Sequence, residues 1–134
     1  RAEVSESNPY WIEKHRYYEL KHFCLQYPIW RQAYNSLGGL SSGTSDFVFS
    51  SNKYNASSPT ERIAIARSFY ADRMNMIEKT AKEADHTLSK YIVIGVTENM
   101  SYDLLRINYD IPCCKDIYYD RYRCFFWLLN KARG

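Results

Sequence analysis

Histidine, cysteine and carboxylate side chains are the groups in this sequence whose types could support catalysis or metal binding. His15 and His22 lie seven residues apart with Glu19 between them, so a helix would place all three on one face, as a metal site requires. However, no third strong ligand falls in register, and a solvated helix face explains these residues equally well. Cys113 and Cys114 lie near a predicted helix start, where a thiol pKa can be lowered, but no partnered histidine follows them. We therefore expect no metal, no cofactor and no enzymatic activity.

The residues that point most clearly to a partner lie in the last third of the chain, from 101 to 134. A short helix is expected over 101–108, a tight connection over 109–112, and a long second helix that begins at Pro112. Two helices joined by about three or four residues form the outline of a helix-turn-helix, whose second helix enters the major groove of DNA.

Several side chains on the second helix suit contact with duplex DNA. Lys115 and Arg123 can donate to guanine O6 and N7 or to phosphate, and the hydroxyls of Tyr119 and Tyr122 suit phosphate oxygens. These four are expected on the outward face of the helix. Three further cations are expected to contact the DNA backbone: Arg106, Lys131 and Arg133.

The overall composition favours a packed, helix-rich protein. The chain has 134 residues, of which 46% are apolar and 25% charged, and no apolar run approaches the roughly 20 residues that span a bilayer. A cytoplasmic protein with four reduced cysteines and no membrane contact is expected. The net charge of +3 is mildly basic, and Asp116 and Asp120 oppose a phosphate backbone. A single copy should therefore bind DNA modestly, which leaves a homodimer and a protein partner open.

Proline and capping signals mark the elements before this region. Asn8-Pro9 predicts a helix start, Pro28 should end or kink that helix, and a shorter helix should follow over 29–37. Residues 38–57 are expected to form a long flexible loop. Ser58 to Glu61 resemble a capping box that opens a helix running to about Ala84.

A third helical segment over 88–96 completes the expected architecture. Its apolar residues would support the two following helices, giving a trihelical unit over about 88–134. Leu104, Leu105 and Ile107 should form the apolar face of the short helix, and Ile117 should be buried on the long one. The predicted fold is all-α, a helical bundle with three parts: an N-terminal helical segment (1–37), a loop (38–57) and a helical domain with the helix-turn-helix (58–134).

The order of these features resembles phage and prophage late-gene transcription activators of the RinA-like and ArpU-like type. The resemblance is carried by the Leu25–Pro28 step, by the helix start from Ser58 to Arg62, and by residues 111–119 running into 123–126. It implies a C-terminal region similar to the promoter-reading domain of sigma factors, and a role in a bacterial host cell as a transcription regulator or as another phage DNA-handling component. RNA polymerase would then be an additional partner.

The alternative is a non-enzymatic phage interaction protein, an adaptor that binds polymerase or a DNA-packaging machine. Thirteen tyrosines and three tryptophans are many for a domain of this size, and both residue types are favoured in interfaces. Trp11, Tyr17, Tyr18 and Trp30 on the N-terminal helices would form the contact or dimer face. A tyrosine-rich core explains the same composition.

Overall fold

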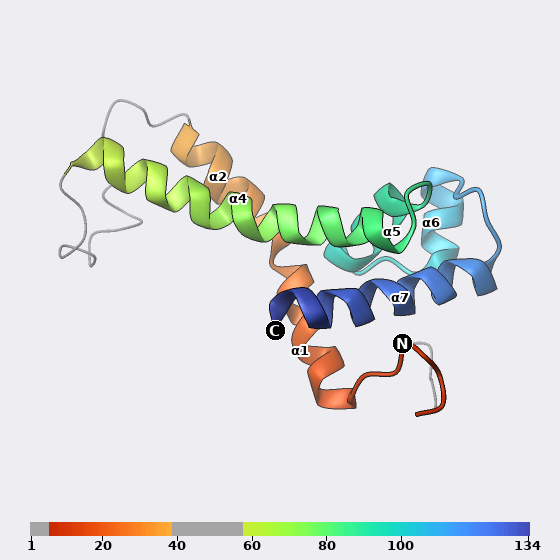
Figure 1. The fold of residues 1–134 in the computed structure, drawn as a ribbon. Helices are drawn as coiled ribbons and strands as arrows, with labels where there is room; N and C mark the ends of the chain where they lie inside the picture. The colour runs from red at the N-terminus through yellow and green to blue at the C-terminus, as the bar shows by residue number, and fades with distance from the viewer. Residues whose placement is uncertain (1–5, 39–57) are drawn as a thin grey trace. The chain divides into compact units, whose positions relative to one another are not determined.

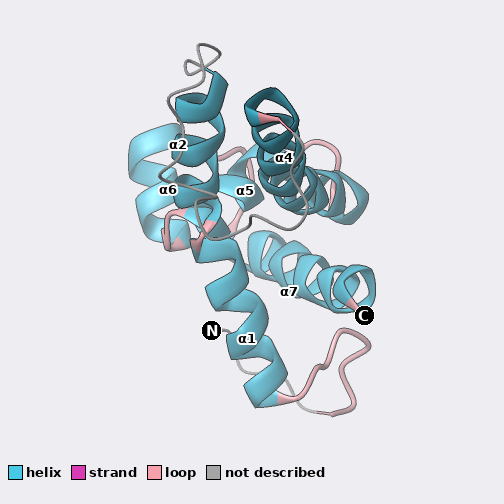
Figure 2. Ribbon diagram, turned by 90° about the vertical axis from the view of Figure 1, so that its left-hand side faces the viewer, coloured by secondary structure: helices cyan, strands magenta, loops and turns pink. Residues whose placement is uncertain are grey.

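The computed structural model describes residues 6–38 and 58–134, and every regular element in these ranges is an α-helix (Figure 2). The all-α prediction is therefore confirmed, whereas the predicted loop lies outside the described residues from position 39 onward. None of the helices in the described ranges has the length and apolar character needed to cross a membrane. The helices in chain order are α1 (Lys14–Leu25), α2 (Tyr27–Gly38), α4 (Pro59–Ala84), α5 (Ser89–Thr97), α6 (Tyr102–Tyr109) and α7 (Lys115–Arg133) (Figure 1).

The chain divides into two compact units, whose boundaries differ from the predicted ones at 37 and 57. Unit 1 combines the N-terminal part up to Tyr27 with residues from Asn75 to the C-terminus, and unit 2 comprises Pro28–Met74. Unit 1 is discontinuous because α1 packs against both α5 and α7. In unit 2, the guanidinium of Arg67 on α4 lies 4.1 Å from the ring centroid of Tyr34 on α2.

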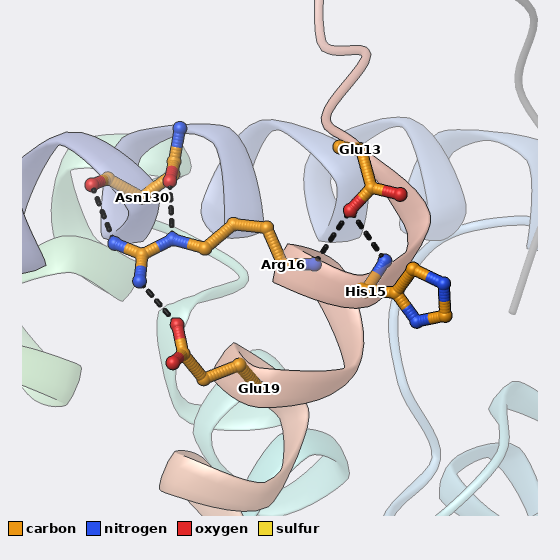
Figure 3. Close-up of polar contacts among 5 residues, drawn as sticks. All are labelled: Glu13, His15, Arg16, Glu19 and Asn130. Atoms are coloured by element: carbon orange, nitrogen blue, oxygen red, sulfur yellow. Dashed lines mark hydrogen bonds and ion pairs between the residues drawn. The ribbon is translucent and has the colours of Figure 1, made fainter.

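The first helix begins later than the Asn8-Pro9 signal predicted. The Asn8 side chain accepts a hydrogen bond from the amide of Tyr10 at 2.8 Å, and its carbonyl accepts one from Trp11 at 3.0 Å, so these residues form a turn. The helix starts at Lys14, where Glu13 is the N-cap. The carboxylate of Glu13 accepts hydrogen bonds from the amides of His15 and Arg16, which satisfies two of the donors left free at a helix start (Figure 3).

The break at Pro28 is confirmed, since α1 ends at Leu25 and α2 begins at Tyr27. The side chains of α2 differ widely in burial. Ile29 is 65% exposed, while Trp30, predicted for an interaction face, and Leu37 are buried.

The start and end of α4 agree with the prediction. The hydroxyl of Ser58 accepts from the amide of Glu61 at 3.1 Å, Pro59 is the first helical residue, and the helix ends at Ala84. Proline costs nothing at this position, because the amide it lacks has no partner within the helix.

The connection between α5 and α6 follows from two local motifs. Asn99 adopts a left-handed conformation with φ of 53°, and the amide of Met100 donates to the carbonyl of Gly95 at 3.0 Å, as in a Schellman motif. The next residue, Ser101, is the N-cap of α6 and accepts from the amide of Leu104 at 3.3 Å. One helix thus ends and the next begins within five residues, from Thr97 to Tyr102.

The prediction that the last helix begins at Pro112 is wrong, because α7 begins at Lys115. Asp110 ends α6 in a left-handed conformation with φ of 53°, and Ile111 then turns into the core. The carbonyl of Cys113 accepts a hydrogen bond from the Tyr102 hydroxyl at 2.6 Å. These contacts hold residues 110–114 in a connection one residue longer than predicted and delay the helix start to the residue after Cys114.

The core of unit 1 is formed by the inner faces of α1, α5, α6 and α7 together with the last turns of α4. The predicted inward residues Leu104, Ile107 and Ile117 are instead 46%, 78% and 52% exposed. The residues that α6 buries are Tyr102 and Leu105. On α7, Tyr118 is buried in the position where Ile117 was expected. Among the described residues, the largest fully buried side chains of unit 1 are Leu20, Ile77, Ile92, Leu105, Tyr118, Phe125, Phe126 and Leu129.

Replacing the cap of α4 should lower the stability of the protein. Ser58→Ala removes the acceptor for the Glu61 amide, and we expect a loss of about 1 kcal/mol, measured by urea denaturation. The matched control is Ser68→Ala, which removes an exposed hydroxyl from the interior of the same helix. Equal stability of the two variants would contradict the cap.

The packing of α5 on α7 depends on a glycine. A Cβ atom at position 95 would lie 2.3 Å from the hydroxyl oxygen of Tyr118. Gly95→Ala should therefore destabilise the protein by about 1–3 kcal/mol, because the well-packed ring must move. Combining it with Tyr118→Phe removes the clashing oxygen and should recover most of the loss in thermal denaturation. A double variant no more stable than Gly95→Ala alone would show that the hydroxyl is not the obstacle.

Candidate nucleic-acid interface

Helices α5, α6 and α7 pack on one another, which is the trihelical arrangement predicted for the C-terminal region (Figure 1). Helix α1 adds a fourth contact, because it packs across α5 and α7. The surface of α7 is therefore divided between a side covered by α1 and α5 and a side open to solvent. Six of the seven predicted DNA-contacting residues lie on different parts of this surface, and the seventh, Arg106, lies on α6.

Lys115 lies at the exposed start of α7, as predicted. The N-cap, Cys114, is also exposed and makes no side-chain hydrogen bond to the helix. The first amides of a helix have no partner within it, and the helix dipole favours an anion at this end. The start of α7 thus combines an ammonium group with amides that no side chain caps, an arrangement that can receive a phosphate.

Arg106 is exposed on α6, in the last turn of that helix. Its neighbours on the outer side of α6 are the carboxylate of Asp103 and the apolar side chains of Leu104 and Ile107. The outer surface of α6 and of the first turn of α7 is thus a mixture of two cations, acidic groups and apolar side chains.

Tyr119 and Tyr122 do not lie on the outward face of α7. The hydroxyl of Tyr122 lies 2.6 Å from that of Tyr17 on α1, and the hydroxyl of Tyr119 accepts from the amide of Tyr102 at 3.2 Å. Both rings belong to an aromatic cluster, here defined as Tyr17, Tyr102, Tyr118, Tyr119, Tyr122 and Phe126, whose neighbouring rings have centroids 4.9–6.0 Å apart. The prediction was wrong in placing them outward, because Tyr122 packs against α1 and Tyr119 against the start of α6.

Arg123 is half-buried, and its Nε is buried without a hydrogen-bond partner among the described residues. Its neighbour Arg121 is fully engaged. The guanidinium of Arg121 pairs with Asp120. It also donates a hydrogen bond of 3.0 Å to the carbonyl of Ala84, which is the last residue of α4. Arg121 therefore caps the C-terminus of α4, and it neutralises one of the two carboxylates that oppose a phosphate backbone.

Lys131 and Arg133 lie at the other end of α7. With a helical rise of 1.5 Å per residue, Lys131 is about 24 Å from Lys115 along the helix axis. The Lys131 ammonium is 3.4 Å from the ring centroid of Trp127, and the Arg133 guanidinium is 4.0 Å from that of Phe23 on α1. Cation–π contacts of this kind hold both side chains on the molecule's own aromatic rings. These two cations and Lys115 therefore form separate sites.

Arg16 fastens α1 to the C-terminal half of α7. Its Nε donates to Oδ1 of Asn130 at 2.6 Å, its Nη2 reaches the Asn130 carbonyl at 3.4 Å, and its Nη1 pairs with Glu19 (Figure 3). Glu19 was the carboxylate considered for a metal site with the two histidines. Figure 3 shows the His15 ring pointing away from Glu19, and the described residues contain no cluster of three or more metal-ligating side chains.

The cysteines are free thiols in the structure. Cys24 and Cys124 are buried. Burial raises the pKa of Cys113, with smaller contributions from Cys114 and Asp85. The lowering of a thiol pKa considered for this pair is therefore wrong for Cys113.

The aromatic residues considered for an interaction face separate into two groups. Tyr17 and Trp30 are buried, whereas Trp11 and Tyr18 are 37% and 40% exposed. A tyrosine-rich core thus accounts for Tyr17 and for the aromatic cluster.

Comparisons of the chain with protein-family models, curated proteins and solved structures find no match.

The aromatic cluster should make stability fall at alkaline pH. Burial and the proximity of Tyr17 raise the pKa of Tyr122, and burial raises that of Tyr118. Unfolded tyrosines ionise near pH 10, so above about pH 10 the unfolded state loses protons that the folded state retains, and unfolding becomes easier. We expect the urea midpoint to fall steadily between about pH 10 and about pH 11.

Tyr122→Phe should reduce this slope, because it removes one of the buried ionisable groups. Burial also raises the pKa of the Cys24 thiol, which lowers stability at alkaline pH in the variant and in the parent protein alike. The slope of the variant is therefore compared with that of the parent protein. Tyr109→Phe, which removes an exposed hydroxyl, is the matched control. An unchanged slope in Tyr122→Phe would contradict the role of this residue.

Proposed function

We propose that this protein is a non-enzymatic DNA-binding regulator that contacts duplex DNA through α6 and the start of α7. The observation that carries the proposal is the exposed start of α7, where Lys115 accompanies helix amides that no side chain caps. Backbone amides at a helix N-terminus and nearby cations are recurrent phosphate contacts in DNA complexes. The packing of α5, α6 and α7 on one another supports the same proposal.

The proposed contact surface is narrower than the sequence suggested. Lys115 and Arg106 are its two exposed cations, while Tyr122 acts indirectly by holding α7 on α1 and Tyr119 by holding it on the start of α6. With few cations, one copy should bind weakly, and its affinity should fall with rising salt by a slope that reflects few phosphate contacts. The resemblance to phage late-gene activators specifies the proposed role further, as transcription regulation in a bacterial host with RNA polymerase as a second partner. The small number of cations favours a homodimer or a protein partner that strengthens binding.

The experiment is a titration of labelled duplex DNA at several salt concentrations, read by fluorescence anisotropy. The unchanged protein should bind more weakly as salt rises, with a log–log slope of about 0.9 for each phosphate contacted. The Arg106→Ala, Lys115→Ala double variant should bind more weakly and lose about one unit of slope per cation. Asp116→Asn should bind more tightly, because it removes an exposed negative charge from the first turn of α7.

The matched control is Lys14→Ala, which removes an exposed cation from the start of α1. Circular dichroism should show the same helix content in all variants. Binding by the double variant that equals that of the parent, with the same salt slope, would contradict the proposed site. No binding at low salt by the parent protein would contradict DNA binding altogether.

A second candidate function is protein docking by an adaptor, and the exposed apolar residues of α6 favour it. Leu104 and Ile107 lie one turn apart on the outer face of this helix, and exposed apolar side chains that adjoin one another are a feature of interaction surfaces. The same DNA titration separates the two candidates, since an adaptor of this kind has no need of Arg106 or Lys115 for duplex binding.

A further inference from the structure

A cavity of about 160 Å³ lies where α1, the α5–α6 connection and the first turns of α7 meet. Its walls include Lys21 from α1, Ser101 at the start of α6, and the tyrosines at 118, 119 and 122. No aspartate or glutamate is among the lining residues. The cavity therefore has one cationic group, several hydroxyl groups and no carboxylate.

Tyr118 is the least accessible of the lining side chains. The residue is only 1% exposed, and its hydroxyl has no hydrogen-bond partner among the described residues. The oxygen lies next to Gly95, another wall residue, where an added Cβ would come within 2.3 Å of it. A buried hydroxyl without a partner is costly, so this group is expected to bind something that enters the cavity.

The start of α6 provides a second feature that favours an anion. Ser101 is the N-cap, and the amide of the next residue, Tyr102, donates to the hydroxyl of Tyr119 at 3.2 Å. Because the Tyr119 oxygen accepts this bond, its own proton is available to donate into the cavity. The positive end of the α6 dipole lies at the same point.

Lys21 adds a full positive charge to these dipoles. It is half-exposed at the cavity and forms no ion pair with the described residues. A cation, a helix N-terminus and hydroxyl donors together match the oxygens of a phosphate or sulfate ion.

We infer that this cavity binds a small oxyanion of phosphate or sulfate size. The size fits, because a cavity of about 150 Å³ in another protein holds a molecule as large as benzene, and typical drug-sized sites begin at about 300 Å³. The Lys21 ammonium binds the anion at the mouth, while the hydroxyls of Tyr118 and Tyr119 donate from within. This inference does not depend on DNA binding, because the walls include neither Lys115 nor Arg106.

The test is calorimetric titration of the protein with inorganic phosphate, with sodium chloride at matched ionic strength as the reference. Phosphate should bind saturably and raise the melting temperature beyond the effect of chloride. Lys21→Gln should weaken phosphate binding by about tenfold or more, because it removes the charge-assisted hydrogen bond. The matched control is Lys14→Gln on the same helix, which changes an exposed lysine outside the cavity and should leave binding unchanged.

Tyr118→Phe provides an independent check on the interior of the cavity. It retains the ring and should keep the fold while weakening phosphate binding, as judged by calorimetry and by unchanged circular dichroism. Equal stabilisation by chloride, or phosphate binding to Lys21→Gln as tight as to the parent, would overturn the inference.

The same oxyanion chemistry could come from a free ion or from the backbone of a nucleic acid, and a DNA titration of Lys21→Gln distinguishes the two. If the cavity binds a free ion, Lys21→Gln loses phosphate binding but binds DNA as tightly as Lys14→Gln does. If the cavity binds a backbone phosphate of DNA, Lys21→Gln loses both phosphate binding and DNA binding, and excess inorganic phosphate displaces DNA from the parent protein.

Discussion

The contact between α1 and α7 is the interaction on which the rest of unit 1 depends. Arg16 holds the C-terminal half of α7 through the side chain and carbonyl of Asn130, and Tyr17 packs edge-to-face on Phe126 while its hydroxyl meets that of Tyr122. This contact covers one side of α7 along much of its length. It thereby decides which side chains of α7 remain open to a partner and which become core.

Local signals were sufficient to predict most of the helices. Ser58 with Pro59 predicted the start of α4, Pro28 predicted the break after α1, and the spacing of apolar residues predicted α5, although its Tyr91–Ile94 run resembles a strand. Signals of this kind act over a few residues, where capping and backbone restriction dominate. The start of α7 was predicted too early because Ile111 is held by the core, a contact that Pro112 does not reveal.

The candidate interface was less predictable, for a physical reason. The residues Tyr119 and Tyr122 are polar enough for a DNA surface and apolar enough for a core, and helical periodicity alone does not choose between these environments. For Tyr122 the choice is made by Tyr17, which lies 105 residues away in the sequence, and for Tyr119 by the amide of Tyr102. In the same way, Leu104 and Ile107 have the types of core residues but lie on the outer side of α6, because Tyr102 and Leu105 fill the inner side. Lys115 and Arg106 were predicted more reliably, since charged residues at helix ends seldom become core.

The discontinuity of unit 1 has a consequence for how the protein forms during translation. Helix α1 leaves the ribosome early, whereas α5 and α7, the helices against which it packs, are synthesised much later. Until then, the apolar face of α1, which includes Leu20, lacks the helices that cover it in the native fold and is open to association with other chains. Closure of the long segment between α1 and α7 carries an entropic cost that precedes any gain from the contact. Unit 1 therefore completes its fold only after α7 has emerged, and a chaperone that shields α1 during that interval would raise the yield of native protein.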